Sequence, residues 1–492
     1  MSKKAAESLA DKTPLKVLFV ASESMPFIKT GGLADVAHAL PKALAALGVD
    51  VRVMIPKHAK IKEEHQDELE TIATSSFMLG WRSKYLGVQK LDEGGVTYYF
   101  IDNEDYYGDA VYRGGDAEIE QYLFFCKAVC EALLLLDFDP DVLHVNDWHT
   151  GMIPYLVKTQ YAESLGRHLK KQLRILFTIH NIEFQGKMGF ALMKDLLSVP
   201  DHYYTPEFIE SGGCANMMKA ALVFADRIST VSPNYANEIM NAWFGQGLEG
   251  ILSARRHEVS GILNGIDNET FDPSSDPSIA AHFSAADITN KRTCKKALRD
   301  EFSLGINLTT PIVSMVSRLT AQKGMALVQH VLEELLCEDV AFVLLGSGDK
   351  KYAEFFNYIA AKYPEKTGIF IGYNEDLAHR IYAGSDFLLM PSEFEPCGLS
   401  QMIAQRYGTL PIVRETGGLI DTVMPYNVYT GEGTGFSFAT FNAHDMLEAI
   451  RKALAVYREK PVFRRLKKNA MLADNGFLKS AEQYRALYKM MM

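Results

Sequence analysis

VLFVASESMPFIKTGGLADV (Val17–Val36) decides the fold, because it passes from an apolar strand through a glycine-rich turn into a helix. Val17–Ala21 is apolar on both faces, which is typical of a parallel strand covered by helices. The helix predicted over Leu33–Leu47 has one apolar stripe, and Pro41 inside it predicts a kink. The stripe consists of Leu33, Val36, Leu40, Leu44 and Leu47. Strand, turn and helix in this order predict an α/β fold.

The same alternation continues along most of the chain. In the first half, the further predicted strands are Val51–Ile55, Val96–Ile101, Val142–Val145, Ile175–Ile179 and Ile228–Val231. In the second half they are Ile312–Val316, Ala341–Leu345, Ile369–Ile371, Phe387–Met390 and Pro411–Val413. Helical patterns fill the gaps. The sequence therefore predicts two doubly wound domains, with ligands bound beyond the carboxyl ends of the strands.

The boundary between these domains is predicted at GILNGID (Gly261–Asp267), where glycine and asparagine interrupt the pattern. We expect a flexible N-terminal tail over residues 1–15 and a first Rossmann-like domain over 16–264. We expect a second Rossmann-like domain over 265–475 and a C-terminal helix within 476–492. This helix is too far from any predicted strand to be assigned to either sheet, and a crossing back to the first domain is left open.

Composition excludes several classes of protein. The net charge of −10 argues against nucleic acid or an anionic membrane as the main partner. The chain has no run of 18 apolar residues, as a membrane span would require. Residues 1–15 contain acidic side chains and no apolar core, which argues against a targeting peptide. The six cysteines form no CxxC pair, which indicates free thiols in a reducing compartment, and we expect a cytoplasmic protein.

The turn after the first strand is a candidate ligand site. Gly31 and Gly32 let the backbone approach a ligand closely, and the helix that follows presents unpaired N–H groups. Lys29 adds a positive charge, so the turn could clamp a diphosphate or a sugar. Taken alone, it also fits an ordinary glycine-rich turn.

Further polar blocks follow the predicted strands and supply a resemblance. They are HVNDWHT (His144–Thr150), TIHN (Thr178–Asn181), VSRLTAQKG (Val316–Gly324), GSGD (Gly346–Asp349), IGY (Ile371–Tyr373), PSEFEPCGLSQ (Pro391–Gln401), TGGLIDTV (Thr416–Val423) and GTGF (Gly433–Phe436). With KTGGLADV they resemble, in order, the segments of bacterial glycogen synthases and plant starch synthases. The resemblance implies the GT-B architecture, in which two Rossmann-like domains face each other across a deep cleft, and it implies no cofactor and no metal.

The resemblance also implies catalytic residues. Glu395 in EFEPCG matches the family carboxylate, which could be a nucleophile or could offset positive charge on the sugar; we assign the second role. His180 matches the active-site histidine that contacts the transferred glucose, and Asp147 is expected to hold the acceptor or a sugar hydroxyl. Trp148 could stack on a glucan, but core packing fits it better.

Local positive charge is expected at the donor diphosphate, because no DxD-type carboxylate pair follows a strand. Arg318 and Lys323, which alone would suggest a surface pair, are assigned to the phosphates together with Lys29. The glycine-rich helix entry at Thr416, Gly417 and Gly418 is expected to help. Tyr373 matches the residue that stacks on the nucleotide base, and Asn264 is expected to reach a phosphate or sugar hydroxyl.

These observations predict a retaining transfer of glucose from ADP-glucose to the non-reducing end of an α-1,4-glucan. Two alternatives stay open at this point. One is a UDP-glucose-dependent synthase of glycogen or starch, since the sequence does not disclose which base the donor carries. The other is a non-catalytic glucan-binding regulatory protein, although the presence of Lys29, His180, Arg318, Lys323 and Glu395 speaks against it.

Overall fold

The computed structural model describes residues 14–108, 110–169 and 171–492. The tail predicted over 1–15 lies almost wholly outside these ranges. The chain divides into two compact domains. The first contains the residues up to Gly265 together with Phe477–Met492, and the second contains Ile266–Gly476. In the described part of the chain, no helix is long and apolar enough to cross a membrane.

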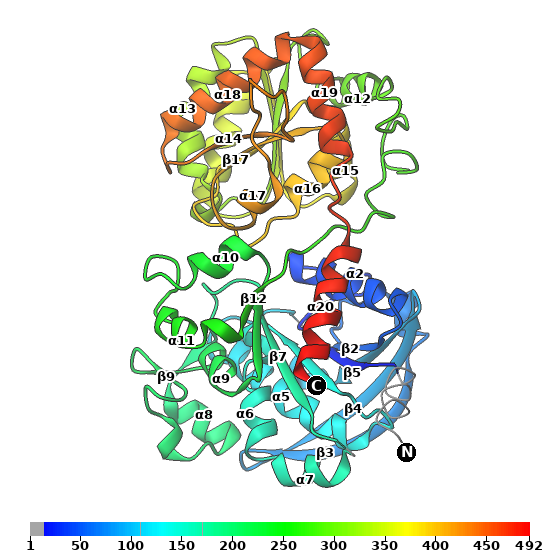
Figure 1. The fold of residues 1–492 in the computed structure, drawn as a ribbon, viewed down its shortest axis with the longest axis vertical. Coiled ribbons are helices and arrows are strands. Elements are labelled where there is room, and N and C mark those ends of the chain that lie inside the picture. Colours follow the sequence, from blue (N-terminus) through cyan, green and yellow to red (C-terminus); the bar gives the residue numbers. More distant parts are fainter. Residues whose placement is uncertain (1–13, 109, 170) are drawn as a thin grey trace, which may run out of the picture. The chain divides into compact units, whose positions relative to one another are not determined.

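A nine-stranded sheet forms the centre of the first domain, in the order β12-β11-β7-β6-β1-β2-β5-β4-β3 (Figure 1). Its strands are β1 (Lys16–Val20), β2 (Asp50–Pro56), β3 (Glu70–Leu79), β4 (Arg82–Glu93), β5 (Val96–Asp102), β6 (Val142–Asn146), β7 (Arg174–Ile179), β11 (Arg227–Thr230) and β12 (Val259–Gly261). The strands from β12 to β5 pair in parallel, whereas β4 pairs antiparallel with both β5 and β3. A small antiparallel sheet contains β8 (Lys187–Met188), β9 (Glu210–Ser211) and β10 (Cys214–Asn216).

Helices cover both faces of the large sheet. Leu18 and Val20 of β1 pack in the same core as α5. Val17 and Phe19, which point the other way, pack with α2 and α20. The helices are α2 (Gly32–Ala46), α3 (Glu63–Gln66), α4 (Glu104–Tyr107), α5 (Gly115–Leu135), α6 (Ile153–Lys158), α7 (Ala162–His168), α8 (Phe190–Leu197), α9 (Met217–Phe224), α10 (Pro233–Glu238), α11 (Glu249–Ala254) and α20 (Phe477–Met491). Short 3-10 turns are η1 (Trp148–Thr150), η2 (Asp201–Tyr203) and η3 (Arg256–Glu258).

The strands predicted in the first half are all present, with ends that differ by no more than one residue. Pro41 lies inside α2, and the kink there stays a prediction. The hairpin β3–β4, the small sheet and β12 are additions to the predicted set.

The last helix, α20, belongs to the core of the first domain. It packs beside α2 (Figure 1) and buries Tyr484 and Tyr488 in the same cluster as Val17. At its start, Ser480 Oγ donates a hydrogen bond to the carbonyl oxygen of Leu263 at 2.5 Å. The first domain is therefore built from both ends of the chain.

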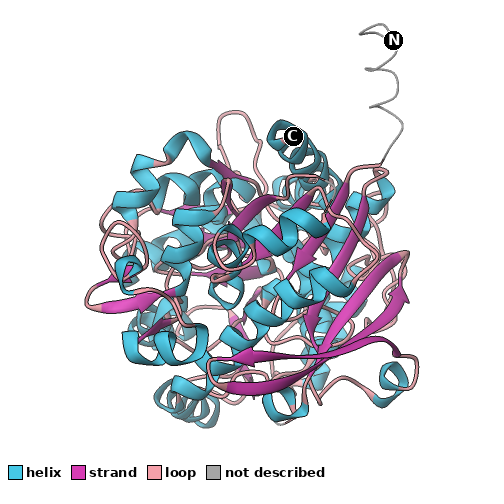
Figure 2. Cartoon of the chain, turned by 90° about the horizontal axis from the view of Figure 1, so that it is seen from below, coloured by secondary structure: helices cyan, strands magenta, loops and turns pink. Residues whose placement is uncertain are grey.

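The second domain contains a six-stranded parallel sheet in the order β15-β14-β13-β16-β17-β18. The strands are β13 (Ile312–Val316), β14 (Ala341–Gly346), β15 (Thr367–Ile371), β16 (Phe387–Met390), β17 (Leu410–Arg414) and β18 (Phe436–Phe438). The helices are α12 (Lys291–Glu301), α13 (Met325–Leu336), α14 (Lys350–Lys362), α15 (Glu375–Gly384), α16 (Ser400–Arg406), α17 (Gly417–Thr422), α18 (Ala443–Arg458) and α19 (Lys460–Met471), with the 3-10 turn η4 (Ala321–Lys323). Figure 2 shows the mixture of helices and strands in both domains. All strands predicted in the second half are present, and β18 is an addition.

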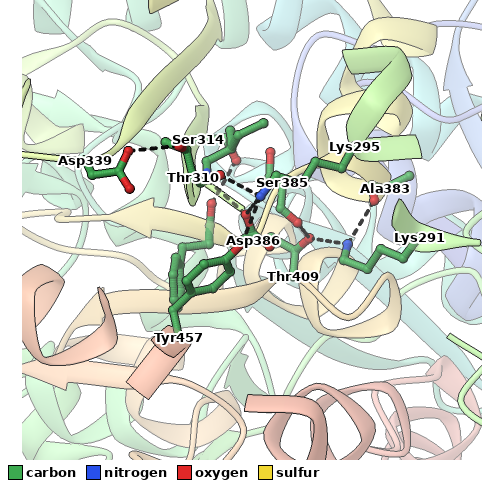
Figure 3. Close-up of polar contacts among 12 residues, drawn as sticks. Lys291, Lys295, Thr310, Ser314, Asp339, Ala383, Ser385, Asp386, Thr409 and Tyr457 are labelled. Atoms are coloured by element: carbon green, nitrogen blue, oxygen red, sulfur yellow. Dashed lines mark hydrogen bonds and ion pairs between the residues drawn. The ribbon is translucent and has the colours of Figure 1, made fainter. Parts of the chain in front are cut away.

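Two buried lysines attach α12 to the second sheet (Figure 3). Lys291 Nζ donates to the carbonyl oxygen of Ala383 at 2.9 Å. Lys295 Nζ lies 2.7 Å from Asp386 Oδ2, which also accepts the backbone N–H of Ile312 at 2.9 Å. Because Ile312 begins β13 and Asp386 precedes β16, this ion pair fixes the starts of two strands whose other ends lead to predicted site residues.

Candidate active site

Asp147 and His180 lie together beyond the ends of β6 and β7. Asp147 has a φ of 57°, a left-handed conformation that is uncommon outside glycine. Its Oδ1 accepts the backbone N–H groups of His180 at 2.7 Å and Asn181 at 3.2 Å. Burial raises the pKa of Asp147 to about 7, although both hydrogen bonds oppose this. The carboxyl group therefore holds the chain at the end of β7, and its charge changes near neutral pH.

The His180 ring is held in one tautomer. The side-chain nitrogen of Asn146 donates to the carbonyl of Val20 at 3.0 Å, so the Asn146 oxygen is the atom that accepts. His180 Nε2 lies 2.9 Å from that oxygen and must carry the hydrogen. Burial lowers the pKa of His180 to about 3, which keeps the ring neutral. Its Nδ1 therefore keeps a lone pair that can accept a hydrogen bond from a substrate hydroxyl.

The glycine-rich turn is organised by a residue that the sequence analysis did not select. Glu23, buried just after β1, accepts the backbone N–H of Thr30 at 2.6 Å and that of Gly31 at 3.1 Å. Burial raises its pKa to about 7. Lys29 forms an ion pair at 2.8 Å with Asp35, in the first turn of α2. Glu23 thus fixes the backbone between Lys29 and the glycines. In the sequence, an acidic residue shortly after a buried strand was the feature that could have identified it.

Two further positions of the first domain are buried. Asn264 follows β12, and its Oδ1 has no hydrogen-bond partner among the described residues. Trp148 packs its ring 4.2 Å from that of His149 and 5.3 Å from that of Tyr122, measured between centroids. This packing agrees with a core role for Trp148.

In the second domain the structure brings Lys323 and Glu395 into direct contact. Lys323 Nζ lies 2.5 Å from Glu395 Oε2, which also accepts the Ser392 hydroxyl at 2.9 Å. The Glu395 side chain is 7% exposed and that of Lys323 is 16% exposed. Gly324, with a φ of 72°, permits this approach, because a Cβ there would lie 2.1 Å from the carbonyl oxygen of Pro391. The predicted catalytic carboxylate and a predicted phosphate ligand therefore form one ion pair.

Arg318 has a different partner. It is exposed, and its Nη2 donates to Gln322 Oε1 at 3.2 Å. Gln322 in turn donates from Nε2 to the carbonyl of Phe394 at 3.3 Å. The prediction that Arg318 and Lys323 act on one diphosphate remains a prediction, and in the free protein the two cations are held by different groups.

The helix entry at Thr416–Gly418 packs against the Glu395 segment. The backbone N–H of Gly418 donates to the carbonyl of Glu395 at 3.0 Å. A Cβ at Gly418 would lie 2.4 Å from the carbonyl oxygen of Cys397, so only glycine fits. Cys397 is buried and forms no disulfide, and Thr416, the residue that precedes α17, is also buried. The entry of α17 and the Glu395 segment are therefore in direct contact.

Tyr373 lies on the loop after β15. Its side chain is 72% exposed, so the ring is accessible to a nucleotide base, and its stacking role stays a prediction. Among the described residues, no group of three or more His, Cys, Asp or Glu side chains could hold a metal ion. Four residues that the sequence analysis did not select form hydrogen bonds with predicted site residues or their turn. They are Glu23, Asn146, Gln322 and Ser392.

Two protein-family models match this chain, one within each domain. The family described as "Starch synthase catalytic domain" matches residues 16–254, and "Glycosyl transferases group 1" matches residues 297–472. Glycogen synthase of Geobacillus thermodenitrificans is 49% identical over 478 residues, which cover 97% of this chain and 98% of that protein. Glycogen synthase of Bacillus cereus (strain Q1) is 47% identical, covering 97% of this chain and 100% of that protein.

Solved structures give the same result. The catalytic domain of starch synthase IV from Arabidopsis thaliana matches with a TM-score of 0.90 at 31% identity, covering 97% of this chain and 99% of that one. Sucrose-phosphate synthase from Thermosynechococcus elongatus matches with a TM-score of 0.61 at 16% identity, which shows a shared fold alone. The chain therefore belongs to the glycogen synthase and starch synthase family and is a glycosyltransferase with the two Rossmann-like domains of the GT-B fold.

Proposed function

We propose that this enzyme transfers glucose from ADP-glucose to the 4-hydroxyl at the non-reducing end of an α-1,4-glucan, with retention of configuration. The starch synthase IV structure has ADP and acarbose bound, which supports an adenine nucleotide as the donor. The relatives named glycogen synthase support the glucan acceptor. The six cysteines, none of which forms a disulfide, support a cytoplasmic location.

The Lys323–Glu395 ion pair is the observation that carries the proposal. When the bond between the sugar and the diphosphate breaks, the sugar ring gains positive charge and the leaving phosphate gains negative charge. Glu395 and Lys323 lie side by side and carry the opposite charges, so the pair can offset both as they develop. In this role Glu395 offsets the oxocarbenium charge and forms no bond to the sugar.

The proposed reaction is a front-face transfer, in which the acceptor attacks from the side that the diphosphate leaves. The C1–O bond to the β-phosphate breaks, and the acceptor 4-oxygen forms a bond to C1 from the same face. The proton of that hydroxyl passes to the departing phosphate oxygen. Arg318, Lys29 and the glycine-rich entry of α17 at Thr416–Gly418 are proposed to meet the rest of the diphosphate charge, without a divalent metal.

The first domain is proposed to bind the sugar. Neutral His180 accepts a hydrogen bond from a glucose hydroxyl through Nδ1. Asp147 accepts the backbone N–H of His180 and so holds this residue in place. The buried Oδ1 of Asn264 has no hydrogen-bond partner among the described residues, so it is proposed to accept a hydrogen bond from a substrate hydroxyl. Tyr373 of the second domain stacks on the base.

Transfer of labelled glucose to glycogen tests the proposal. ADP-glucose and UDP-glucose are compared as donors at equal concentration, with Glu395→Gln as the inactive reference. The new linkage is examined by NMR for its anomeric configuration. Preference for ADP-glucose and an α linkage are expected, whereas preference for UDP-glucose or a β linkage would contradict the donor or the retention.

A further inference from the structure

A series of buried hydrogen bonds joins the C-terminal helix to β6 and β7. The hydroxyl of Tyr488 lies 2.7 Å from His144 Nδ1, and His144 Nε2 lies 2.6 Å from Thr178 Oγ1. Thr178 Oγ1 lies 2.6 Å from Ser229 Oγ. All four side chains are fully buried, and we call them the Tyr488 relay. Apolar residues would fill this space at lower desolvation cost, so the polar set calls for a reason.

The relay is uncharged. Burial lowers the pKa of His144 well below its ordinary value and raises the pKa of Tyr488 well above its own. The imidazole is therefore neutral and the phenol protonated. A neutral imidazole has one N–H and one lone pair, and each has a hydroxyl partner here. Its orientation is fixed on both sides by hydrogen bonds.

The relay lies one step along the strands from the His180 contact. The parallel register pairs Asn146 with Thr178. Because alternate residues of a strand share a face, His144 and Asn146 lie on one face of β6. By the same rule, Thr178 and His180 lie on the matching face at the end of β7. The contacts His144–Thr178 and Asn146–His180 are therefore successive links between the same two strands.

Aromatic residues of α20 contact His144. Between ring centroids, His144 lies 5.8 Å from Tyr488 and 5.3 Å from Tyr484. The ring of Phe19 in β1 also packs against His144, at 4.6 Å. α20 is not part of the sheet, so where it docks determines where the Tyr488 hydroxyl lies. A displacement of α20 would change the hydrogen bond that orients His144.

We propose that Tyr488 is a positioning residue for the transfer reaction, which through His144 and Thr178 fixes the strand ends that carry Asp147 and His180. This rests on the proposed function, because that function assigns those two residues to the substrate. The C-terminal helix then serves the reaction in addition to completing the core. Tyr488 itself touches no substrate in this role.

Tyr488→Phe tests the proposal because it removes one oxygen atom and keeps the ring. Tyr155→Phe is the matched control, since Tyr155 is also fully buried in the first domain and its hydroxyl has no hydrogen-bond partner among the described residues. The kcat of Tyr488→Phe should fall about 2- to 30-fold, with the KM for the donor little changed. The kcat of Tyr155→Phe should stay close to that of the natural enzyme. Equal kcat losses in both variants would overturn the proposal.

Thr178 supplies a second test within the same relay. Thr178→Val removes the hydroxyl at nearly constant size, whereas Thr178→Ser keeps it. The valine variant should show the same kcat loss as Tyr488→Phe, and the serine variant should recover most of it. The double variant Tyr488→Phe with Thr178→Val should be no slower than the slower single variant, because both interrupt one series of contacts. Independent, multiplicative losses would contradict the relay.

A spectroscopic measurement separates this proposal from the proposed function. In protein with ¹⁵N-labelled histidine, the ring signals of His180 should move in Tyr488→Phe and stay in place in Tyr155→Phe. This result requires no turnover. If the natural enzyme transferred no glucose from either nucleotide sugar, the proposed function would fail, while the His180 signals would still decide whether Tyr488 positions that ring. Unchanged His180 signals in Tyr488→Phe would overturn the proposal.

Discussion

Lys323→Met should destabilise the second domain through its effect on Glu395. Methionine keeps most of the apolar length of lysine and removes only the ammonium group. Glu395 would retain the Ser392 hydroxyl but lose the cation 2.5 Å away, and its side chain is only 7% exposed. An anionic group at that depth cannot recover the lost interaction from water.

The size of the effect follows from this burial. A hydrogen bond to a charged group contributes about 1.5–3 kcal/mol, and breaking a fully buried ion pair costs about 3–5 kcal/mol. Because Lys323 is 16% exposed, we place the cost where these ranges meet, at about 3 kcal/mol. For a domain of this size, that corresponds to a fall in melting temperature of roughly 6–12 °C.

Calorimetric melting of four proteins measures this: the natural enzyme, Lys323→Met, Glu395→Gln and the double variant. Glu395→Gln should also melt lower, since it leaves Lys323 without its anion. The double variant should lose less than the sum of the singles, by about 1–3 kcal/mol. In transfer assays, Lys323→Met should lower kcat by about 10²–10³. A melting temperature within 2 °C of the natural one (about 1 kcal/mol or less) together with additive losses would refute the ion-pair reasoning.

Four other predictions address the rest of the candidate site. Arg318→Ala should lower kcat by about 10²–10³ and Arg318→Lys should recover only part, because a point charge does not replace a planar fork; near-normal kcat in Arg318→Ala would make it a surface residue. Transfer should persist in EDTA, and activity that vanished there and returned with Mg²⁺ or Mn²⁺ would contradict the assigned basic residues. Gly324→Ala should destabilise by at least about 1–2 kcal/mol, since its φ is 72° and its Cβ would meet the Pro391 carbonyl, whereas Gly166→Ala, with open space around it, should melt normally. Glu23 has a folded pKa of about 7, raised from 4.5, so the folded state holds its proton more tightly and stability falls as pH rises from 4.5 to 7. Relative to Glu23→Gln, the natural enzyme should lose about 3 kcal/mol over that window in denaturant titrations, and parallel pH profiles would count against the burial of this carboxyl.

The parallel strands were predictable because their residues are apolar on both faces and short turns bound them. The hairpin β3–β4 was not, because β3 (ETIATSSFML) is mostly exposed and has no buried stripe to reveal it. Strands β8 and β9 are two residues long, which is too short for any periodicity. Packing with neighbouring segments creates these elements.

For the candidate site, the sequence proposes individual residues but does not indicate which of them pair. The order of the motif blocks selected Glu395 and Lys323, yet these residues are 72 positions apart and nothing in either block indicates that they touch. Likewise, Glu23 could be read as a loop carboxylate, and only the folded turn shows that it accepts the N–H groups of Thr30 and Gly31. Hydrogen bonds between segments depend on tertiary geometry, which composition and spacing do not encode.

The place of α20 in the first domain sets the order in which the two domains can be completed during synthesis. Residues 266–476 form a continuous domain that has left the ribosome before Phe477–Met492 can follow. The first domain starts earlier but lacks Tyr484, Leu487 and Tyr488 of its core until Phe477–Met492 has been synthesised. Its apolar surface beside α2 and β1 therefore stays open while the second domain folds, so the N-terminal domain is the last to be finished and the one exposed to chaperones and proteases in the meantime.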